Sequence, residues 1–268
     1  MRKIRVPASS ANLGPGFDVL GMAIDRYIEV EFTEEGVGSP DNLTMKVFRE
    51  FGGAGGLKIT STIPPARGMG FSGAARIAGL LATAIQNGRE LDEETRRWLF
   101  LEATQLEGHP DNVAPSVFGG VTVAVGDRVE SVPLGLQANV ILWVPDNSSG
   151  TRASRRKLPK EISMEDAVFN MGRTALLLAA LTNGDTDLLG EATQDRLHQQ
   201  IRLEALPETA KAMQAAKDAG AWCSWLSGSG PTAAALCEPA IAQRVADALP
   251  AGGNVSISHI DMRGAVYE

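Results

Sequence analysis

A glycine-rich segment, Pro64–Ala75, constrains the fold more than any other part of this 268-residue sequence. Alternating apolar residues precede it, as in a half-buried strand. Apolar residues with the period of a helix follow it, at Ala74, Ile77, Ala78, Leu81 and Ile85. We therefore expect this segment to lead the chain from a strand into an amphipathic helix.

Three glycines in the segment, Gly68, Gly70 and Gly73, permit left-handed backbone and the close approach of a ligand. Small residues after them leave the unpaired N–H groups of the first helical turn open to an anion. The pattern predicts a cradle for nucleotide phosphates; a strand–helix turn without a ligand is the alternative. It is neither the Rossmann nor the Walker pattern, because Arg76 ends it and no lysine followed by serine or threonine is present.

Other strand and helix patterns follow one another irregularly. We expect strands at residues 28–33, 57–63, 121–125, 140–144, 221–226, 232–237 and 255–260, and helices at 165–181, 187–200 and 207–219. The run 140–144 is apolar throughout, which is typical of a strand buried on both faces. Without a regular βαβ alternation, the sequence predicts an α+β fold. The polar stretch at 145–151 predicts a boundary between two domains, residues 1–146 and 147–268.

Charge and composition exclude several functional classes. The net charge is −7, which disfavours nucleic acid and anionic membranes as partners. No apolar run approaches the ~20 residues that cross a bilayer, and the N-terminus turns polar too early for a signal peptide. Cys223 and Cys237 make neither a disulfide framework nor a zinc site, so we expect them to be buried apolar residues. These features predict a cytoplasmic protein that binds a small molecule.

The glycine-rich loop resembles the phosphate motif of the GHMP kinase superfamily, usually P-x-x-x-G-L-G-S-S-A-A. The matching residues are Pro64, Gly68, Gly70, Ser72, Ala74 and Ala75, whereas Phe71 and Gly73 depart. The resemblance implies ATP and Mg²⁺ as cofactors. It implies ATP contacts at Pro64, Arg67, Gly68, Met69, Gly70, Phe71, Ser72, Gly73 and Ala74, with Ser72 also binding the metal.

Other segments resemble the same superfamily in its homoserine kinase form. Pro7–Gly21 is similar to the first motif, Glu107–Pro115 to the signature E-G-H-P-D-N-V-A-P, and Leu226–Thr232 to the third motif. Residues 146–159 and 195–202 resemble the segments S-T-K-x-A-R…L-P and D-x-L-H-Q-P-Y-R, and the resemblance covers residues 4–262. It implies a two-lobed fold, with an N-terminal half like ribosomal protein S5 domain 2 and a ferredoxin-like C-terminal half.

The resemblance also implies a site for a hydroxylated amino acid. The implied substrate-binding residues are Asn12, Asp18, His109, Asn112, Thr151, Arg155 and Arg202. The two arginines would grip a carboxylate, since guanidinium groups pair with carboxylates bidentately. No general base is assigned, because homoserine kinases have an asparagine in the pocket, Asn112 here. Without the resemblance, Asp18 is a turn residue and the arginines form surface ion pairs; His198 and His259 are expected to be structural.

The implied metal site departs from the family at one position. The family often has a Mg²⁺-binding glutamate four residues before the signature histidine, and Gln105 stands there in this sequence. An amide is a poor ligand for this hard cation. Glu102, one helical turn earlier, is the expected substitute, and Glu107 is a weaker candidate. The predicted metal residues are therefore Ser72, Gln105 and Glu102.

Together these residues predict ATP-dependent phosphorylation of the side-chain hydroxyl of homoserine or a similar hydroxylated amino acid. The resemblance also allows a homodimer. Two alternatives stay open. Departures at Phe71, Gly73, Gln105 and Ser154 leave room for another small alcohol as the acceptor. The loss of the metal glutamate would also suit a catalytically weak regulator that binds a metabolite.

Overall fold

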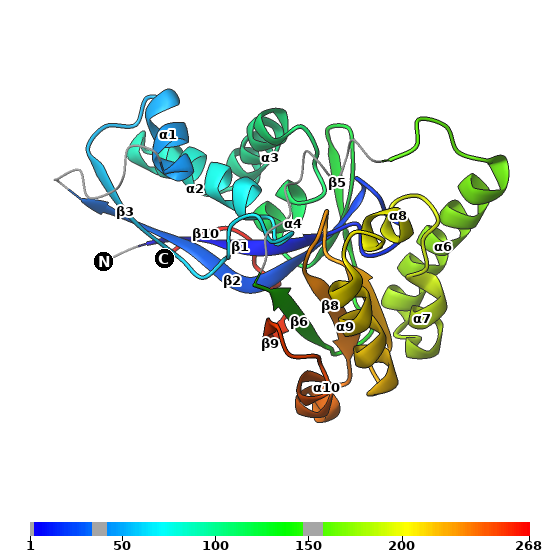
Figure 1. Ribbon diagram of the computed structural model, residues 1–268. Helices are drawn as coiled ribbons and strands as arrows, with labels where there is room; N and C mark the ends of the chain where they lie inside the picture. The colour runs from blue at the N-terminus through cyan, green and yellow to red at the C-terminus, as the bar shows by residue number, and fades with distance from the viewer. Residues whose placement is uncertain (1–2, 34–41, 147–157) are drawn as a thin grey trace.

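Two antiparallel sheets form the frame of the computed structural model, which describes residues 3–33, 42–146 and 158–268 (Figure 1). The first sheet has the order β10-β1-β2-β4-β5, with β3 also paired to β2; the second has the order β7-β8-β6-β9. The first contains β1 Ile4–Ala11, β2 Leu20–Thr33, β3 Gly56–Ser61, β4 Val121–Val125, β5 Arg128–Val132 and β10 Val266–Tyr267. The second contains β6 Asn139–Pro145, β7 Cys223–Leu226, β8 Ala233–Cys237 and β9 Gly253–His259.

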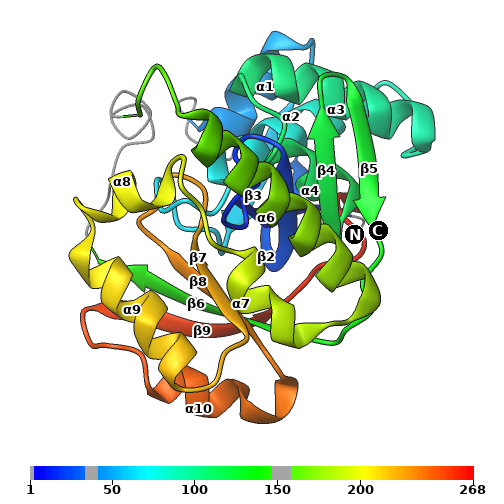
Figure 2. The same ribbon diagram turned by 90° about the vertical axis from the view of Figure 1, so that its right-hand side faces the viewer.

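Helices cover both sheets. Figure 1 shows four of them above the first sheet: α1 Leu43–Glu50, α2 Phe71–Gln86, α3 Glu93–Glu107 and α4 Val113–Phe118. Figure 2 shows α9 Pro207–Asp218 and α10 Ala242–Asp247 beside the second sheet. The remaining helices of the described ranges are α6 Met164–Asn183, η1 Thr186–Leu188, α7 Leu189–Ala192, α8 Gln199–Leu203 and η2 Pro239–Ile241. Across the described ranges, no helix combines the length and the apolar character that a membrane crossing requires.

One hydrophobic core joins the two halves of the chain. It contains Met22 from the first sheet, Leu236 from the second and Leu177 from α6. The halves also exchange strands, because β6 pairs with β8 and β9 of the second sheet while the C-terminal β10 pairs with β1 of the first. The predicted boundary at residue 146 stays a prediction, and residues 147–157 lie outside the described ranges.

The predicted elements are present, with one exception. The run 140–144 lies within β6, where residues 140–143 are buried. Helix α2 begins directly after Gly70, and Gly73 lies in its first turn. Both cysteines are buried as predicted, and burial raises the pKa of Cys223 to about 12. The helix predicted at 187–200 is wrong, because residues 193–198 form a turn. The Asp195 carboxylate accepts N–H bonds from Leu197, His198 and Gln199, which begins α8 anew.

A close helix crossing yields a test of the packing. An added Cβ at Gly79 in α2 would lie 2.6 Å from the Thr44 carbonyl oxygen and 2.9 Å from Val47 Cβ in α1. Gly79→Ala is expected to lower the free energy of unfolding by roughly 1–3 kcal/mol, because a packed backbone must shift. Gly172→Ala in α6 is the control, since nothing lies within 4 Å of its Cβ position. It should raise stability by about 0.5–1 kcal/mol in urea denaturation; equal effects of the two substitutions would contradict this packing.

Candidate active site

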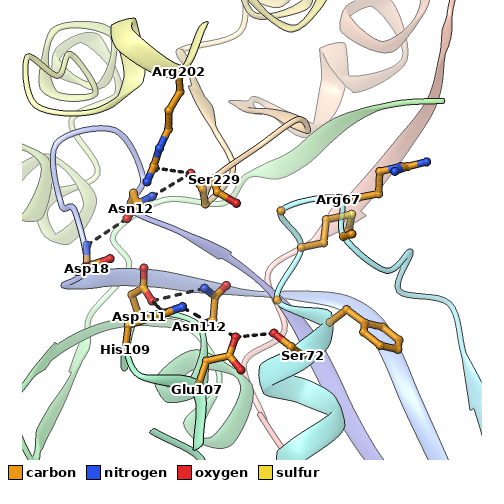
Figure 3. A pocket seen from close by; sticks show the side chains of 16 residues that line it. Asn12, Asp18, Arg67, Ser72, Glu107, His109, Asp111, Asn112, Arg202 and Ser229 are labelled. Atoms are coloured by element: carbon orange, nitrogen blue, oxygen red, sulfur yellow. Dashed lines mark hydrogen bonds and ion pairs between the residues drawn. The ribbon is translucent and has the colours of Figure 1, made fainter. Parts of the chain in front are cut away.

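A pocket of about 220 Å³ lies where α2 begins, and residues far apart in the sequence line it (Figure 3). Its lining comprises Asn12, Asp18, residues 66–72, Glu107, His109, Asp111, Asn112, Arg202, Gly228 and Ser229. Residues of the first motif, the phosphate loop, the signature Glu107–Pro115, the third motif and the segment 195–202 therefore meet in one cavity. The predicted residues Pro64, Gly73, Ala74, Glu102 and Gln105 do not line it. Thr151 and Arg155 lie outside the described residues.

The phosphate loop has the geometry of an anion cradle. Gly68 and Gly70 have φ values of +73° and +65°, in the left-handed region that glycine adopts without strain. A side chain at Gly68 would collide with the Ser227 carbonyl, and one at Gly70 with the Ser9 hydroxyl. Gly70 is the N-cap of α2, and no side chain of the described residues caps this end. The N-terminus of a 16-residue helix thus opens onto the pocket, where it favours an anion.

A carboxylate stands beside this loop. The Ser72 hydroxyl donates a hydrogen bond to Glu107 Oε1, and the Arg76 guanidinium forms an ion pair with Glu107 Oε2. His109 Nε2 lies 3.9 Å from Glu107 Oε1, while His109 Nδ1 lies 2.5 Å from Asp111 Oδ1. The buried Asp111 therefore orients the imidazole toward Glu107.

Ser72 and Glu107 fit a Mg²⁺ ion that takes its other ligands from a nucleotide. Mg²⁺ usually binds one or two carboxylates together with substrate phosphates, and it prefers such hard oxygen donors. The sequence favours Gln105 and Glu102 over Glu107 as metal ligands, yet Glu107 is the carboxylate that contacts Ser72. Residues two apart on a helix point about 200° apart. Gln105 accordingly faces solvent, so the candidate metal residues become Ser72 and Glu107.

The opposite wall of the pocket carries an amide, a carboxylate and a guanidinium. Asn12 and Asp18 have φ values of +71° and +57°, a conformation that Asn and Asp tolerate better than other side chains. Asn12 Oδ1 accepts a bond from the Asp18 N–H (3.1 Å), and Asn12 Nδ2 donates to the Gly228 carbonyl (3.0 Å). Arg202 Nη1 donates to the same carbonyl (3.1 Å). The Gly228 carbonyl thus fixes the positions of the Asn12 and Arg202 side chains, whose hydrogen bonds converge in Figure 3.

The burial of Arg202 decides whether it is a surface ion-pair residue or a residue of the pocket. The residue is only 5% exposed, and its Cζ lies 5.3 Å from the centre of the Phe17 ring, so Arg202 does not form a surface ion pair. His259, by contrast, lies outside the pocket lining and pairs with Asp25 at 2.9 Å. Asp111 is a further residue of the pocket, which was not among the site residues predicted from the sequence. Its position two residues after His109 was the available signal, since an adjacent carboxylate commonly orients a histidine ring.

Comparison with protein families decides the identity of this arrangement. The family model for the GHMP kinase N-terminal domain matches residues 42–120, and the model for the C-terminal domain matches residues 177–255. The chain belongs to the GHMP kinase family. The predicted resemblance and the two-lobed α+β fold are thereby confirmed. As a GHMP kinase, the chain is a phosphotransferase with an alcohol group as acceptor and ATP as a substrate.

Relatives within the GHMP kinases include several homoserine kinases. One from Thermus thermophilus is 42% identical over 255 residues, which cover 87% of this chain and 86% of the relative. That of Desulfitobacterium hafniense is 39% identical, with 93% of this chain and 91% of the relative covered. The crystal structure of homoserine kinase from Cytophaga hutchinsonii has a TM-score of 0.85 at 26% identity, and covers 99% of this chain and 96% of its own.

The Ser72–Glu107 pair predicts which carboxylate governs the metal requirement. Glu107→Gln should raise the free Mg²⁺ concentration at half-maximal velocity by about tenfold, because a charged ligand of the hard cation is lost. Metal-free ATP binding, measured by calorimetry in EDTA, should not weaken.

Gln105→Glu on the same helix is the matched control. Its side chain faces solvent, so the half-saturating Mg²⁺ concentration should stay at the wild-type value. A lower Mg²⁺ requirement in Gln105→Glu, together with an unchanged one in Glu107→Gln, would return the metal site to residue 105.

Proposed function

We propose that this chain transfers the γ-phosphoryl group of ATP to the side-chain hydroxyl of L-homoserine in the cytoplasm, giving O-phospho-L-homoserine. The observation that carries the proposal is a single pocket in which a buried arginine and an aspartate stand across from a phosphate-type loop. The names and the 39–42% identities of the homoserine kinase relatives support the same acceptor.

The charges of the pocket suit a small zwitterion. Arg202 offers a buried guanidinium, which pairs with a carboxylate more strongly than an exposed one would. Asp18 offers a carboxylate to an ammonium group, and its backbone is held by Asn12. An α-amino acid brought in this way would direct its side-chain hydroxyl toward the loop at residues 68–72. A neutral sugar would leave the arginine without its anion.

Positioning and charge neutralisation supply most of the catalysis in phosphoryl transfer. The helix N-terminus at Gly70–Phe71 and the loop glycines would hold the phosphates, and Arg67 lines the same cavity. Mg²⁺ held by Ser72 and Glu107 would neutralise phosphate charge. Asn112, whose Oδ1 accepts a bond from the Ser9 hydroxyl at 3.0 Å, would fix the acceptor side without acting as a base.

A panel of acceptors tests the proposal. With ADP release coupled to a spectrophotometric readout, homoserine should show the highest kcat/KM among homoserine, threonine, serine, mevalonate and simple sugars. Mevalonate or a sugar at the head of this series would contradict the amino-acid acceptor, although the chain would remain a GHMP kinase.

The buried arginine gives a second prediction. Arg202→Met should raise the KM for homoserine about 30- to 1,000-fold, corresponding to roughly 2–4 kcal/mol for a charge pair that loses one partner. The KM for ATP should change little. Arg196→Met is the control from the same segment, because Arg196 is 42% exposed and pairs with Glu165 away from the pocket. Unchanged homoserine KM in Arg202→Met would overturn the carboxylate clamp.

A further inference from the structure

His198 is buried behind Arg202, where its ring bridges two parts of the pocket wall. Its side chain is fully buried, with 0% exposed. Nε2 lies 2.8 Å from the Gly14 carbonyl oxygen, and Nδ1 lies 3.0 Å from Arg202 Nη1. Both nitrogens of the imidazole are therefore engaged, one with the first motif and one with the arginine.

The two partners of His198 define its protonation. A carbonyl oxygen can only accept a hydrogen bond, so Nε2 must carry a proton. A guanidinium can only donate, so Nδ1 must be unprotonated. His198 is thus a neutral imidazole in the Nε2–H form, and only this form satisfies both neighbours.

These contacts complete a closed circuit of hydrogen bonds. Arg202 Nη1 donates to His198 and to the Gly228 carbonyl, which also accepts from Asn12 Nδ2. His198 in turn bonds the Gly14 carbonyl, two positions after Asn12 in the same loop. The hydrogen bonds and this short piece of backbone therefore form a closed ring. Both protons of Nη1 are used in this circuit, which fixes the plane of the guanidinium.

We propose that His198 is a positioning residue: it holds the Arg202 guanidinium at the angle that receives the acceptor carboxylate and ties it to the loop carrying Asn12 and Asp18. The inference rests on the proposed function, because it gives Arg202 a carboxylate to bind. His198 lines no part of the pocket and acts only through the arginine.

The charged groups around the ring keep it neutral. Burial lowers the pKa of His198 below its ordinary value, and the Arg202 charge adds to this. Asp195 Oδ2, 3.8 Å from Nε2, and Asp18 act in the opposite direction, but burial is the largest cause. Asp195 is also occupied, since it accepts three backbone N–H bonds and one from Asn170 Nδ2. A proton on Nδ1 would face the guanidinium N–H and displace Arg202.

Three substitutions separate the two contacts of the ring. The amide oxygen of an asparagine occupies the place of Nδ1, so His198→Asn keeps an acceptor for Arg202 and loses the Gly14 bond. The amide nitrogen of a glutamine lies near the place of Nε2, so His198→Gln keeps the Gly14 bond and loses the acceptor. His198→Leu removes both. Melting temperatures of all three report any general loss of structure.

The three variants are expected to differ in their KM for homoserine. His198→Leu and His198→Gln should raise the KM for homoserine about tenfold, a loss typical of one hydrogen bond to a charged group. His198→Asn should stay within about threefold, and kcat and the KM for ATP should stay near wild type in all three. Equal KM increases in the asparagine and glutamine variants, or increases that follow melting temperature alone, would overturn the positioning role.

Acidification supplies an independent readout. The wild-type KM for homoserine should rise as the pH falls below about 6.5, the ordinary histidine pKa, because the pKa of His198 is lowered and its protonation begins under that value. His198→Asn lacks this titration, so the ratio of wild-type to variant KM should rise on acidification; groups common to both proteins cancel. A ratio that falls on acidification, or that changes only above about pH 6.5, the ordinary histidine pKa, would contradict the inference.

Arg202→Met, measured beside the His198 variants, separates the carboxylate clamp at Arg202 from the positioning role of His198. If Arg202→Met raises the homoserine KM and no His198 variant does, the proposed function stands and the positioning role fails. If Arg202→Met itself leaves that KM unchanged, the carboxylate clamp fails, and the positioning role of His198 fails with it.

Discussion

The turn at residues 227–232 is hydrogen-bonded to both walls of the pocket. Ser227 Oγ and Thr232 Oγ1 donate to the carbonyls of Gly68 and Arg67 in the phosphate loop, each at 2.6 Å. On the other side, the Gly228 N–H donates to Ala11, and the Gly228 carbonyl accepts from Asn12. The loop that would hold phosphates and the loop that would hold the acceptor are therefore fixed to one short segment, which sets the distance between them.

Strand pairing between the two halves of the chain supports this arrangement. The turn connects β7 and β8 of the second sheet, whereas the first motif includes the end of β1 and the loop that leads to β2 in the first sheet. The hydrophobic core shared by both sheets holds the first motif and the 227–232 turn next to each other. A hydrogen bond also joins the two sheets directly, from Trp225 Nε1 to the buried Ser10 hydroxyl (2.9 Å). Left-handed backbone at Asn12 and Asp18 is tolerated because neighbouring hydrogen bonds hold it in place.

Sequence reasoning was strongest where local chemistry decides structure. Glycines before an amphipathic period predicted the loop and α2, and the apolar run in β6 predicted its burial. Prediction from the sequence was weaker where contacts between distant parts of the chain decide the structure. The strand β1 is buried along nearly its whole length but contains Pro7 and two serines, which hide its pattern. The turn before α8 depends on one carboxylate, Asp195, and the choice of Glu107 over Gln105 depends on which face of α3 meets Ser72. Neither follows from spacing alone.

The central claim is that one cavity binds the phosphates of ATP at the 68–72 loop and an amino-acid carboxylate at Arg202. A crystal structure with a non-hydrolysable ATP analogue and homoserine tests it most directly. The account predicts the γ-phosphate beside Ser72 and Glu107, the homoserine carboxylate on the Arg202 guanidinium, and the hydroxyl facing the phosphate. Homoserine bound elsewhere, or with its carboxylate away from Arg202, would contradict it.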